Sequence, residues 1–290
     1  MRPKEFIDHN TDNPMSIKKL FILSALLWAV LPGAGAQTDS TFYIAGPMGR
    51  LASRLQLPAT EPGKRCHIVV LCHGFTGNMG GPLFDGIARD LLAEGIGVLR
   101  FDFNAHGRSD GEFRNMTVPN EIEDALAVVD WARRQSQTRD VSLLGHSQGG
   151  VVAAMAAGKL GRKAVKAVVL IAPAAVLRDD ALRGNTMGAF YDPWNAPEYV
   201  QLPSGHQLGR DYIRTALTLP IYETAARYEG PVFIIHGQAD RIVPYTYGER
   251  FRDVMPRSAI EVIPGEDHGF SADTPRAASL AASWLAKTLR

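Results

Sequence analysis

The chain has 290 residues, of which 46% are hydrophobic and 21% are charged, a composition typical of a globular protein with a large buried core. Its 31 basic residues nearly balance its 30 acidic residues, and the formal net charge is +1. This balance argues against nucleic acid as a partner and against binding to an anionic membrane surface. At this length we expect one large α/β domain rather than two small ones.

The first 36 residues have the pattern of an export signal. Two lysines precede the apolar run Leu20–Leu31, and the small-residue sequence GAGA ends at Ala36. This order predicts a signal peptide that is cleaved after Ala36, and an exported protein that is periplasmic or secreted. The apolar run is too short to span a bilayer as a helix, so no stable membrane anchor is expected. The polar stretch before Met15 leaves open whether Met1 or Met15 is the true start.

From residue 37 onward, strand-like apolar runs alternate with helical patterns. An antiparallel hairpin is expected first, over Thr41–Gly46 and Gly49–Leu57. The strands expected after it are Ile68–Leu71, Gly97–Phe103, Val141–Leu144, Val165–Ile171, Val232–His236 and Ala259–Ile263. The expected helices are Leu83–Glu94, Glu121–Gln135, Gly150–Leu160, Tyr245–Val254 and Pro275–Leu289. This alternation predicts a mostly parallel central sheet with helices on both faces.

The only cysteines, Cys66 and Cys72, lie in the segment CHIVVLC, which is typical of one extended buried strand. In a strand their Cα atoms would be about 20 Å apart, too far for a disulfide. We therefore expect two free, buried thiols.

The segment 174–229 interrupts the alternation. It is rich in glycine, proline and aromatic residues and contains no clear strand for the sheet. An irregular segment of this length is uncommon in a compact domain unless it has a function. We interpret it as a cap, inserted in the domain 37–290 and lying over the carboxyl edge of the sheet.

The sequence LGHSQGG places Ser147 between a predicted strand and an alanine-rich predicted helix. This strand, turn and helix are typical of the nucleophile elbow of α/β-hydrolases. Gly145 and Gly149 lack a Cβ, so neighbouring backbones can approach closely while the serine adopts a strained turn. A glycine-rich turn without chemistry is the alternative, and the surrounding elements favour the nucleophile.

A serine nucleophile needs a base and a group that orients the base. Asp240 in HGQADRIVP and His268 in IPGEDHGF each follow a predicted strand, in the chain order of an α/β-hydrolase. We expect His268 to accept the proton of Ser147 and Asp240 to hold the imidazole. Asp267 is the competing acid, and Asp240 is favoured because adjacent residues rarely point at one another.

The oxyanion of the reaction also needs donors. The backbone N–H of Gln148, after the nucleophile, and that of Phe75, in CHGFTGNMGG, are the candidates. His73 is expected to support this loop structurally.

Nothing in the sequence indicates a metal or a cofactor. The histidines show no ligand spacing such as H-E-x-x-H, and no nucleotide-binding loop is present. The segment RFDFNAHGRSDG carries a charged cluster that we expect to brace the loop beside the site: Asp102, His106, Arg108 and Asp110.

Several phrases together resemble the bacterial cinnamoyl (feruloyl) esterases of the α/β-hydrolase superfamily, over roughly residues 42–290. The phrases are HGFTGN, LRFDFNAHGRSDG, NMTV, LLGHSQGG, LIAPAAVLRDDALRGNT, LPIYE and HGQADRIVP. The resemblance implies an α/β-hydrolase fold with a mostly parallel sheet and an inserted cap. It also implies the same triad and oxyanion residues, and hydrolysis of ferulate, p-coumarate or caffeate esters through an acyl-enzyme.

In the cap, the resemblance implies that Asp180 and Tyr212 lie near the phenolic end of a hydroxycinnamate. Similar enzymes carry a glutamine where this sequence has Met187. A thioether there favours an aromatic edge or a methoxy group, and hence a feruloyl over a caffeoyl ester.

Two other functions are compatible with these residues. An esterase or monoacylglycerol lipase for aliphatic acyl esters would use the same triad, although the polar pair in the cap argues against a purely apolar pocket. A catalytically inactive hydrolase fold could serve as a binding module, which the complete triad disfavours. The expected partner is a small-molecule ester, for example a feruloylated oligosaccharide, and the oligomeric state, including a homodimer, stays open.

Overall fold

The computed structural model describes residues 37–59, 61 and 63–290. The predicted signal peptide and both candidate start methionines lie outside the described residues. None of the helices within the described ranges is long and apolar enough to cross a bilayer.

An eight-stranded sheet forms the centre of the domain, in the order β1-β2-β4-β3-β5-β6-β11-β12. Its strands are β1 Thr38–Gly46, β2 Gly49–Leu57, β3 Cys66–Cys72, β4 Gly97–Phe101, β5 Thr138–His146, β6 Val168–Ile171, β11 Val232–Gly237 and β12 Ser258–Ile263. The hairpin β1–β2 is antiparallel and joins β4 in antiparallel fashion, whereas all other neighbours are parallel. The predicted mostly parallel sheet with an edge hairpin is therefore confirmed.

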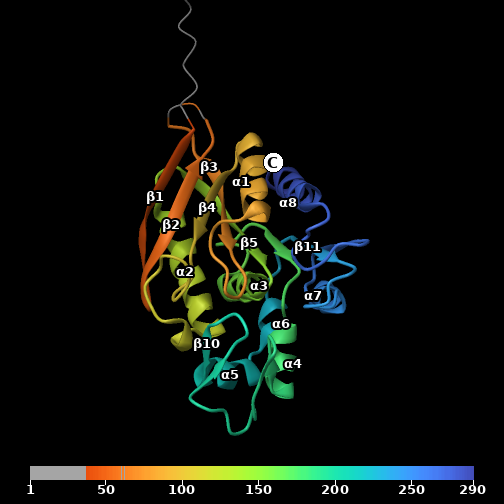
Figure 1. Ribbon diagram of the computed structural model, residues 1–290. Helices are drawn as coiled ribbons and strands as arrows, with labels where there is room; N and C mark the ends of the chain where they lie inside the picture. The colour runs from red at the N-terminus through yellow and green to blue at the C-terminus, as the bar shows by residue number, and fades with distance from the viewer. Residues whose placement is uncertain (1–36, 60, 62) are drawn as a thin grey trace, which may run out of the picture. The chain divides into compact units, whose positions relative to one another are not determined.

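Helices cover both faces of this sheet (Figure 1). On one face lie α1 Pro82–Ala93 and α8 Thr274–Leu289, and on the other lie α2 Val118–Arg134, α3 Gln148–Leu160 and α7 Thr246–Val254. Alternate residues of β3 explain the two cores, because strand side chains point to opposite faces in turn. Val69 and Leu71 pack with α1 and α8, whereas Ile68 and Val70 pack with α2 and α3.

Two predicted strands are shorter in the structure than expected. β4 ends at Phe101 because the Phe103 N–H donates to the His73 ring, 3.0 Å away, rather than to a neighbouring strand. β6 begins at Val168 because the chain turns after α3, where the Val165 N–H donates to the Gly161 carbonyl. The end of β4 is thus set by a contact with a residue far along the chain, and the start of β6 by a turn. An apolar run in the sequence reveals neither.

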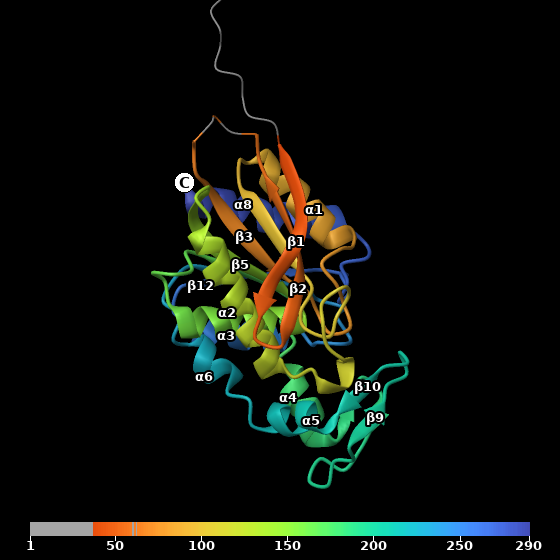
Figure 2. The same cartoon turned by 90° about the vertical axis from the view of Figure 1, so that its left-hand side faces the viewer.

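We use the name cap segment for residues 174–229, between β6 and β11. It contains α4 Val176–Arg183, α5 Arg210–Leu217 and α6 Ile221–Ala225. Short antiparallel pairs join β7 Asn185–Thr186 with β8 Ala189–Phe190, and β9 Tyr199–Gln201 with β10 Gln207–Gly209. None of these strands joins the central sheet, and α4, α5, β9 and β10 lie beyond one end of it in both views (Figure 2).

The cap segment packs closely against the turn η1 Phe113–Asn115, which follows β4 in the chain. A Cβ added to Gly209, at the end of β10, would lie 1.9 Å from the Arg114 carbonyl oxygen. The two backbones therefore touch at a point that only glycine permits.

Both cysteines lie in β3, are buried and are free of disulfides, as expected. Burial raises the pKa of the Cys72 thiol, which therefore stays protonated at neutral pH.

Candidate active site

Ser147 occupies the sharp turn between β5 and α3. Its φ is 58°, which is strained for a residue with a Cβ. A Cβ added to Gly145 would lie 2.0 Å from the Gly149 carbonyl oxygen, and one added to Gly149 would lie 2.2 Å from the Cys72 carbonyl oxygen. The close approach that the sequence predicts for these glycines is therefore present.

The structure brings Ser147, His268 and Asp240 into one hydrogen-bonded row. His268 Nε2 lies 2.9 Å from Ser147 Oγ, and His268 Nδ1 lies 2.7 Å from Asp240 Oδ2. The three residues follow β5, β12 and β11, whose carboxyl ends meet at the same edge of the sheet. In this arrangement His268 can take the hydroxyl proton while Asp240 holds its Nδ1–H.

The Asp240 carboxylate is held on both oxygens. Its Oδ1 accepts the N–H groups of Ile242 at 2.9 Å and Val243 at 2.8 Å, and its Oδ2 lies 3.3 Å from His236 Nε2. Burial raises the pKa of the Asp240 carboxyl, but hydrogen bonds from His236 and His268 outweigh burial and hold the pKa below its ordinary value. The group is therefore ionised at neutral pH and can stabilise an imidazolium.

Asp267, the competing acid, faces its own loop. Its Oδ1 accepts the N–H groups of Gly269 and Ser271, each at 3.0 Å. In the described part of the chain it makes no hydrogen bond to the His268 ring. The structure thus places Asp240 rather than Asp267 on His268.

His73 orients the first candidate oxyanion donor. A backbone N–H can only donate, so the bond from Phe103 N to His73 Nε2 places the ring proton on Nδ1, which donates to the Gly74 carbonyl at 2.8 Å. Burial lowers the pKa of His73 to about 3, so the ring is neutral. Because the peptide between Gly74 and Phe75 is trans, its N–H points away from His73. Gly74 itself lies against Ser147, since a Cβ added to Gly74 would be 2.9 Å from Ser147 Cβ.

The second candidate donor is the N–H of Gln148, the first residue of α3. Helix amino ends carry partial positive charge and leave their first N–H groups unpaired. Among the described residues, neither the Gln148 N–H nor the Phe75 N–H donates to a protein acceptor. Both groups can therefore stabilise an oxyanion that forms at Ser147.

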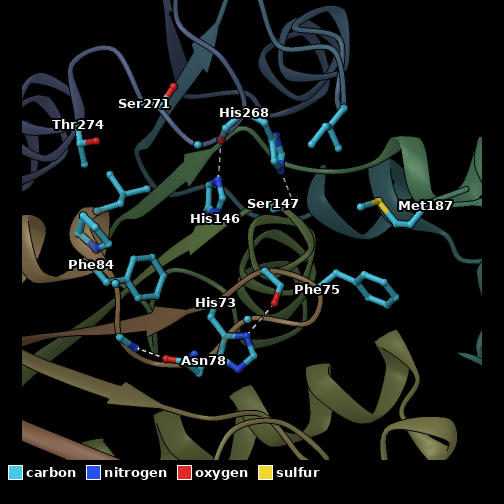
Figure 3. Close-up of a pocket in the computed structure, with 18 residues that line it drawn as sticks. His73, Phe75, Asn78, Phe84, His146, Ser147, Met187, His268, Ser271 and Thr274 are labelled. Atoms are coloured by element: carbon cyan, nitrogen blue, oxygen red, sulfur yellow. Dashed lines mark hydrogen bonds between the residues drawn. The ribbon is translucent and has the colours of Figure 1, made fainter. Parts of the chain in front are cut away.

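A cavity of about 610 Å³ opens over Ser147 (Figure 3). Phe84 and Thr274 lie at one side of the view and Phe75 and Met187 at the other, with Ser147 between them. Among the described residues, none that lines this cavity is Asp, Glu, Lys or Arg. An uncharged wall with a few polar groups suits a neutral substrate.

His146, which we did not single out from the sequence, also lines this cavity. Its Nε2 donates to the His268 carbonyl at 2.9 Å, and the two rings are 5.0 Å apart. Burial lowers the pKa of His146 to about 4, so the ring is neutral. It steadies the loop of His268, and its place directly before Ser147 was the signal that could have found it.

The three cap residues named from the resemblance are placed differently. Met187 lines the cavity and is 50% exposed. Asp180, on α4, pairs with Arg183 at 2.8 Å, and Tyr212, on α5, is buried and donates its hydroxyl to Gln148 Oε1 at 2.8 Å. Asp180 and Tyr212 do not line the cavity and are not hydrogen-bonded to each other. The structure therefore brings only Met187 to the opening over Ser147.

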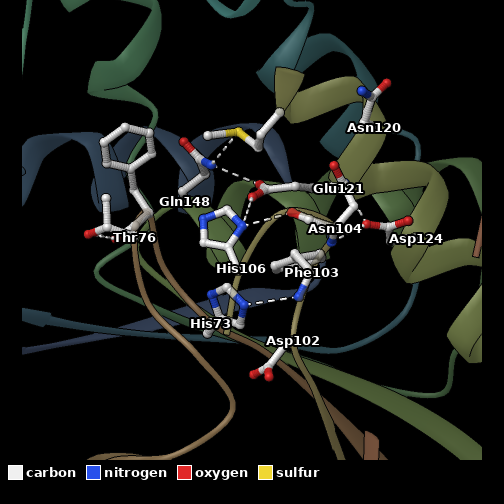
Figure 4. Close-up of polar contacts among 12 residues, drawn as sticks. His73, Thr76, Asp102, Phe103, Asn104, His106, Asn120, Glu121, Asp124 and Gln148 are labelled. Atoms are coloured by element: carbon white, nitrogen blue, oxygen red, sulfur yellow. Dashed lines mark hydrogen bonds and ion pairs between the residues drawn. The ribbon is translucent and has the colours of Figure 1, made fainter. Parts of the chain in front are cut away.

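A buried acid beneath the elbow was also missed from the sequence. Glu121, on α2, is 1% exposed and accepts a hydrogen bond from Gln148 Nε2 at 2.8 Å (Figure 4). Burial raises the pKa of Glu121 well above its ordinary value. The signal lay in the helical pattern, because Glu121 falls on the same buried stripe as Val118 and Ala125.

The charged cluster after β4 braces the loop as expected. Asp102 accepts the N–H groups of Met79 at 2.7 Å and Arg108 at 2.9 Å, and so ties the loop after β3 to the loop after β4. Asp110 pairs with Arg50 of β2. Within the described ranges no three His, Cys, Asp or Glu side chains are grouped to hold a metal ion.

Known proteins share this fold. The family model described as serine aminopeptidase, S33, matches residues 63–198. The structure of Est1E from Butyrivibrio proteoclasticus with ferulic acid bound superimposes with a TM-score of 0.81 and 30% identity, over 86% of this chain and 99% of that chain. The chain belongs to the α/β-hydrolase family of serine hydrolases. It is an enzyme of the ester-hydrolysing class.

Curated relatives include lipases. A monoacylglycerol lipase of Mycolicibacterium smegmatis is 27% identical over 264 residues, which cover 80% of this chain and 91% of the lipase. The lysophosphatidylserine lipase ABHD12 of Danio rerio is 24% identical over 233 residues, and the match covers 75% of this chain and 58% of that protein.

Proposed function

We propose that this protein is a serine esterase that hydrolyses hydroxycinnamate esters, with Ser147 as nucleophile, His268 as base and acid, and Asp240 as the orienting carboxylate. The observation that carries the proposal is the hydrogen-bonded row from Asp240 through His268 to Ser147 at the mouth of an uncharged cavity.

The geometry supports a two-step reaction. Ser147 Oγ attacks the ester carbonyl carbon while His268 Nε2 takes the hydroxyl proton, and the carbonyl oxygen becomes an oxyanion near the Phe75 and Gln148 N–H groups. His268 then gives the proton to the leaving alcohol oxygen, the C–O bond breaks and an acyl-enzyme remains. Water, deprotonated by His268, attacks the acyl carbon and releases the acid and Ser147.

Two features favour a hydroxycinnamoyl group. The similar structure of Est1E holds ferulic acid. The cavity side that Phe75 and Met187 form offers an aromatic ring and a thioether, which suit an aromatic ring or a methoxy group. We expect a feruloyl ester to be preferred over a caffeoyl ester for this reason, and a feruloylated oligosaccharide is a candidate natural substrate.

Asp180 and Tyr212 stay the candidates to meet the phenolic hydroxyl if the ring enters the cap segment. Burial of an unpaired hydroxyl costs about 1–3 kcal/mol, so some cap group has to pair with it. The Tyr212 hydroxyl already donates to Gln148, which leaves it an acceptor for the phenol. The half-buried Asp180 carboxylate can accept the phenolic proton in the same way.

A second candidate is an esterase for aliphatic acyl esters, including monoacylglycerols. The relative named monoacylglycerol lipase favours it, as does the apolar wall that Pro82, Leu83 and Phe84 give the cavity.

We also propose that the protein is exported through its N-terminal segment and that the mature chain begins at Gln37. Mass spectrometry of the protein from its native host would test this.

A substrate panel separates the two candidates. We expect kcat/KM for methyl ferulate and methyl p-coumarate to exceed that for monoacylglycerols and for p-nitrophenyl alkanoates longer than butyrate by about tenfold or more, as expected for a site that pairs a buried polar group. Methyl cinnamate, which lacks the phenolic hydroxyl, is the matched control. A preference for the long alkanoates would overturn the hydroxycinnamate proposal in favour of the lipase-like one.

A further inference from the structure

We infer that Tyr212 of the cap segment and Glu121 of α2 are positioning residues for the oxyanion hole, and that they act through the side chain of Gln148. The inference rests on the proposed function, in which the Gln148 and Phe75 N–H groups receive the oxyanion. It assigns Tyr212 a role in the reaction of every ester, separate from recognition of a phenol.

A buried hydrogen-bond chain carries the first part of the argument. The Tyr212 hydroxyl donates to Gln148 Oε1 at 2.8 Å, and Gln148 Nε2 donates to Glu121 Oε2 at 2.8 Å. All three residues are at most 2% exposed, so water does not compete for these bonds. Figure 4 shows the Gln148 amide directed at Glu121. The amide is thus held from opposite ends by two elements that are far apart in the sequence.

This side chain and one oxyanion donor belong to the same residue. Gln148 is the first residue of α3 and directly follows Ser147 in its strained turn. A side chain fixed at both ends restricts the rotation of its own backbone N–H. Oxyanion donors are effective only within about 2.7–3.1 Å of the developing charge, so small rotations of this N–H change its strength.

An independent contact links Tyr212 to the other donor. The Tyr212 ring lies 5.6 Å from the ring of Phe75, and the Phe75 ring in turn lies 5.4 Å from that of Phe113. The Phe75 ring is therefore packed between the cap segment and the turn after β4. Tyr212 thus contacts both residues whose N–H groups are the proposed oxyanion donors, one through its hydroxyl and one through its ring.

The state of Glu121 supports the same role. Its Oε1 lies 3.9 Å from His106 Nδ1, which itself bonds the Asn104 carbonyl, and burial raises the pKa of the carboxyl. The nearby acid Asp124 also raises it. A raised pKa lessens the negative charge that Glu121 carries beneath the oxyanion while it accepts from Gln148.

The test is Tyr212→Phe, which keeps the ring against Phe75 and removes only the hydroxyl. We expect kcat for methyl cinnamate, which has no phenolic hydroxyl, to fall about tenfold, less than the loss from removing a whole donor, with its KM unchanged within about twofold. The kcat for methyl ferulate should fall by at least as much. The affinity for phenylboronic acid, which forms a tetrahedral adduct with the serine, should fall by the same factor. Binding of free cinnamic acid, which makes no such adduct, should not change.

Two further variants keep the result interpretable. Glu121→Gln retains an acceptor for Gln148 and should keep most of kcat, whereas Glu121→Leu should lower kcat as Tyr212→Phe does. The control is Tyr228→Phe, because the buried Tyr228 hydroxyl donates to the Val165 carbonyl at 3.0 Å, away from the elbow. It loses a comparable hydrogen bond and should leave kcat unchanged.

The outcomes separate this inference from the proposed function. A loss of kcat confined to methyl ferulate would show that Tyr212 recognises the phenolic hydroxyl. An unchanged kcat and an unchanged boronate affinity in Tyr212→Phe would show that the hydrogen-bond chain does not position the donors. Either result overturns the inference and leaves the proposed esterase function intact. If the wild-type enzyme hydrolyses no ester of the panel, the proposed function falls and the inference falls with it.

Discussion

Ser147 is held in a strained conformation by bonds on both sides of its backbone. Its N–H donates to the Ile171 carbonyl at 2.9 Å, and its carbonyl accepts from Gly150 at 2.9 Å and from Ala174 at 3.0 Å. A residue at such a φ costs about 1–3 kcal/mol, which these contacts with β6, the loop after it and α3 offset. The result is a hydroxyl that stands clear of the helix and faces His268.

The assignment of the acid can be tested by a pair of single substitutions. Asp240→Asn should lower kcat by about 10⁴-fold, because an amide there favours the wrong imidazole tautomer. Asp267→Asn should change kcat little, because within the described residues the Asp267 side chain bonds only its own loop. Steady-state kinetics on methyl ferulate measure both. If Asp267→Asn proved the more damaging change, the acid would have to be reassigned.

Ser147, Asp240 and His268 could be predicted from the sequence because each follows a strand of a parallel sheet, and the carboxyl ends of such strands meet at one edge. Tyr212 and Glu121 could not be linked to the elbow in this way. Their contacts with Gln148 depend on how α5 and α2 pack in space, and nothing in the local sequence around either residue specifies a partner far along the chain.

At the level of secondary structure, the turn from β5 to α3 determines where Ser147 lies. Gly149→Ala tests this steric account directly. A Cβ at this position would lie 2.2 Å from the Cys72 carbonyl oxygen and 2.3 Å from that of His73, and backbone atoms cannot move aside as a side-chain end can. We expect a loss of about 1–3 kcal/mol in the free energy of unfolding, measured by urea denaturation.

The control for this variant is Gly269→Ala, where the nearest atom to an added Cβ is 3.8 Å away. That substitution should leave the free energy of unfolding within about 0.5 kcal/mol of wild type, as a surface change normally does. Equal stabilities of the two variants would show that close packing of the elbow does not depend on Gly149.

The strands of the central sheet and the helices that cover it could be predicted from their apolar periodicity. The elements inside the cap segment could not. Its strands are two or three residues long, as in β7 and β9, and too short to produce a visible alternation. Its position beyond one end of the sheet is set by contacts such as that of Gly209 with Arg114, which involve the backbone and leave no side-chain pattern.

For the molecule as a whole, buried neutral histidines make stability depend on pH. Burial lowers the pKa of His67 to about 4, below an unfolded value of about 6.5. As the pH falls below about 6.5, the unfolded chain binds the proton first and stability is lost, until the folded form also titrates near pH 4. Glu121, whose pKa is raised, acts in the opposite sense, so a comparison of two variants is needed.

The variant His67→Gln removes this single titration while every other group is retained. We expect the free energy of unfolding of the wild type, relative to the variant, to fall by about 1.4 kcal/mol per pH unit between about pH 6 and 4.5. Urea denaturation of both proteins at several pH values measures the difference. A difference that does not vary with pH would mean that the buried His67 is not kept neutral by the fold.

Covalent labelling tests whether Ser147 is an activated nucleophile. The native protein would be incubated with a fluorophosphonate and digested, and the modified peptide would be sequenced by mass spectrometry. We predict one phosphonyl group per chain, on Ser147, and none on Ser147→Ala or on the urea-unfolded protein. A label on another residue, or an unlabelled native protein, would contradict the assignment of Ser147, His268 and Asp240 as the catalytic residues.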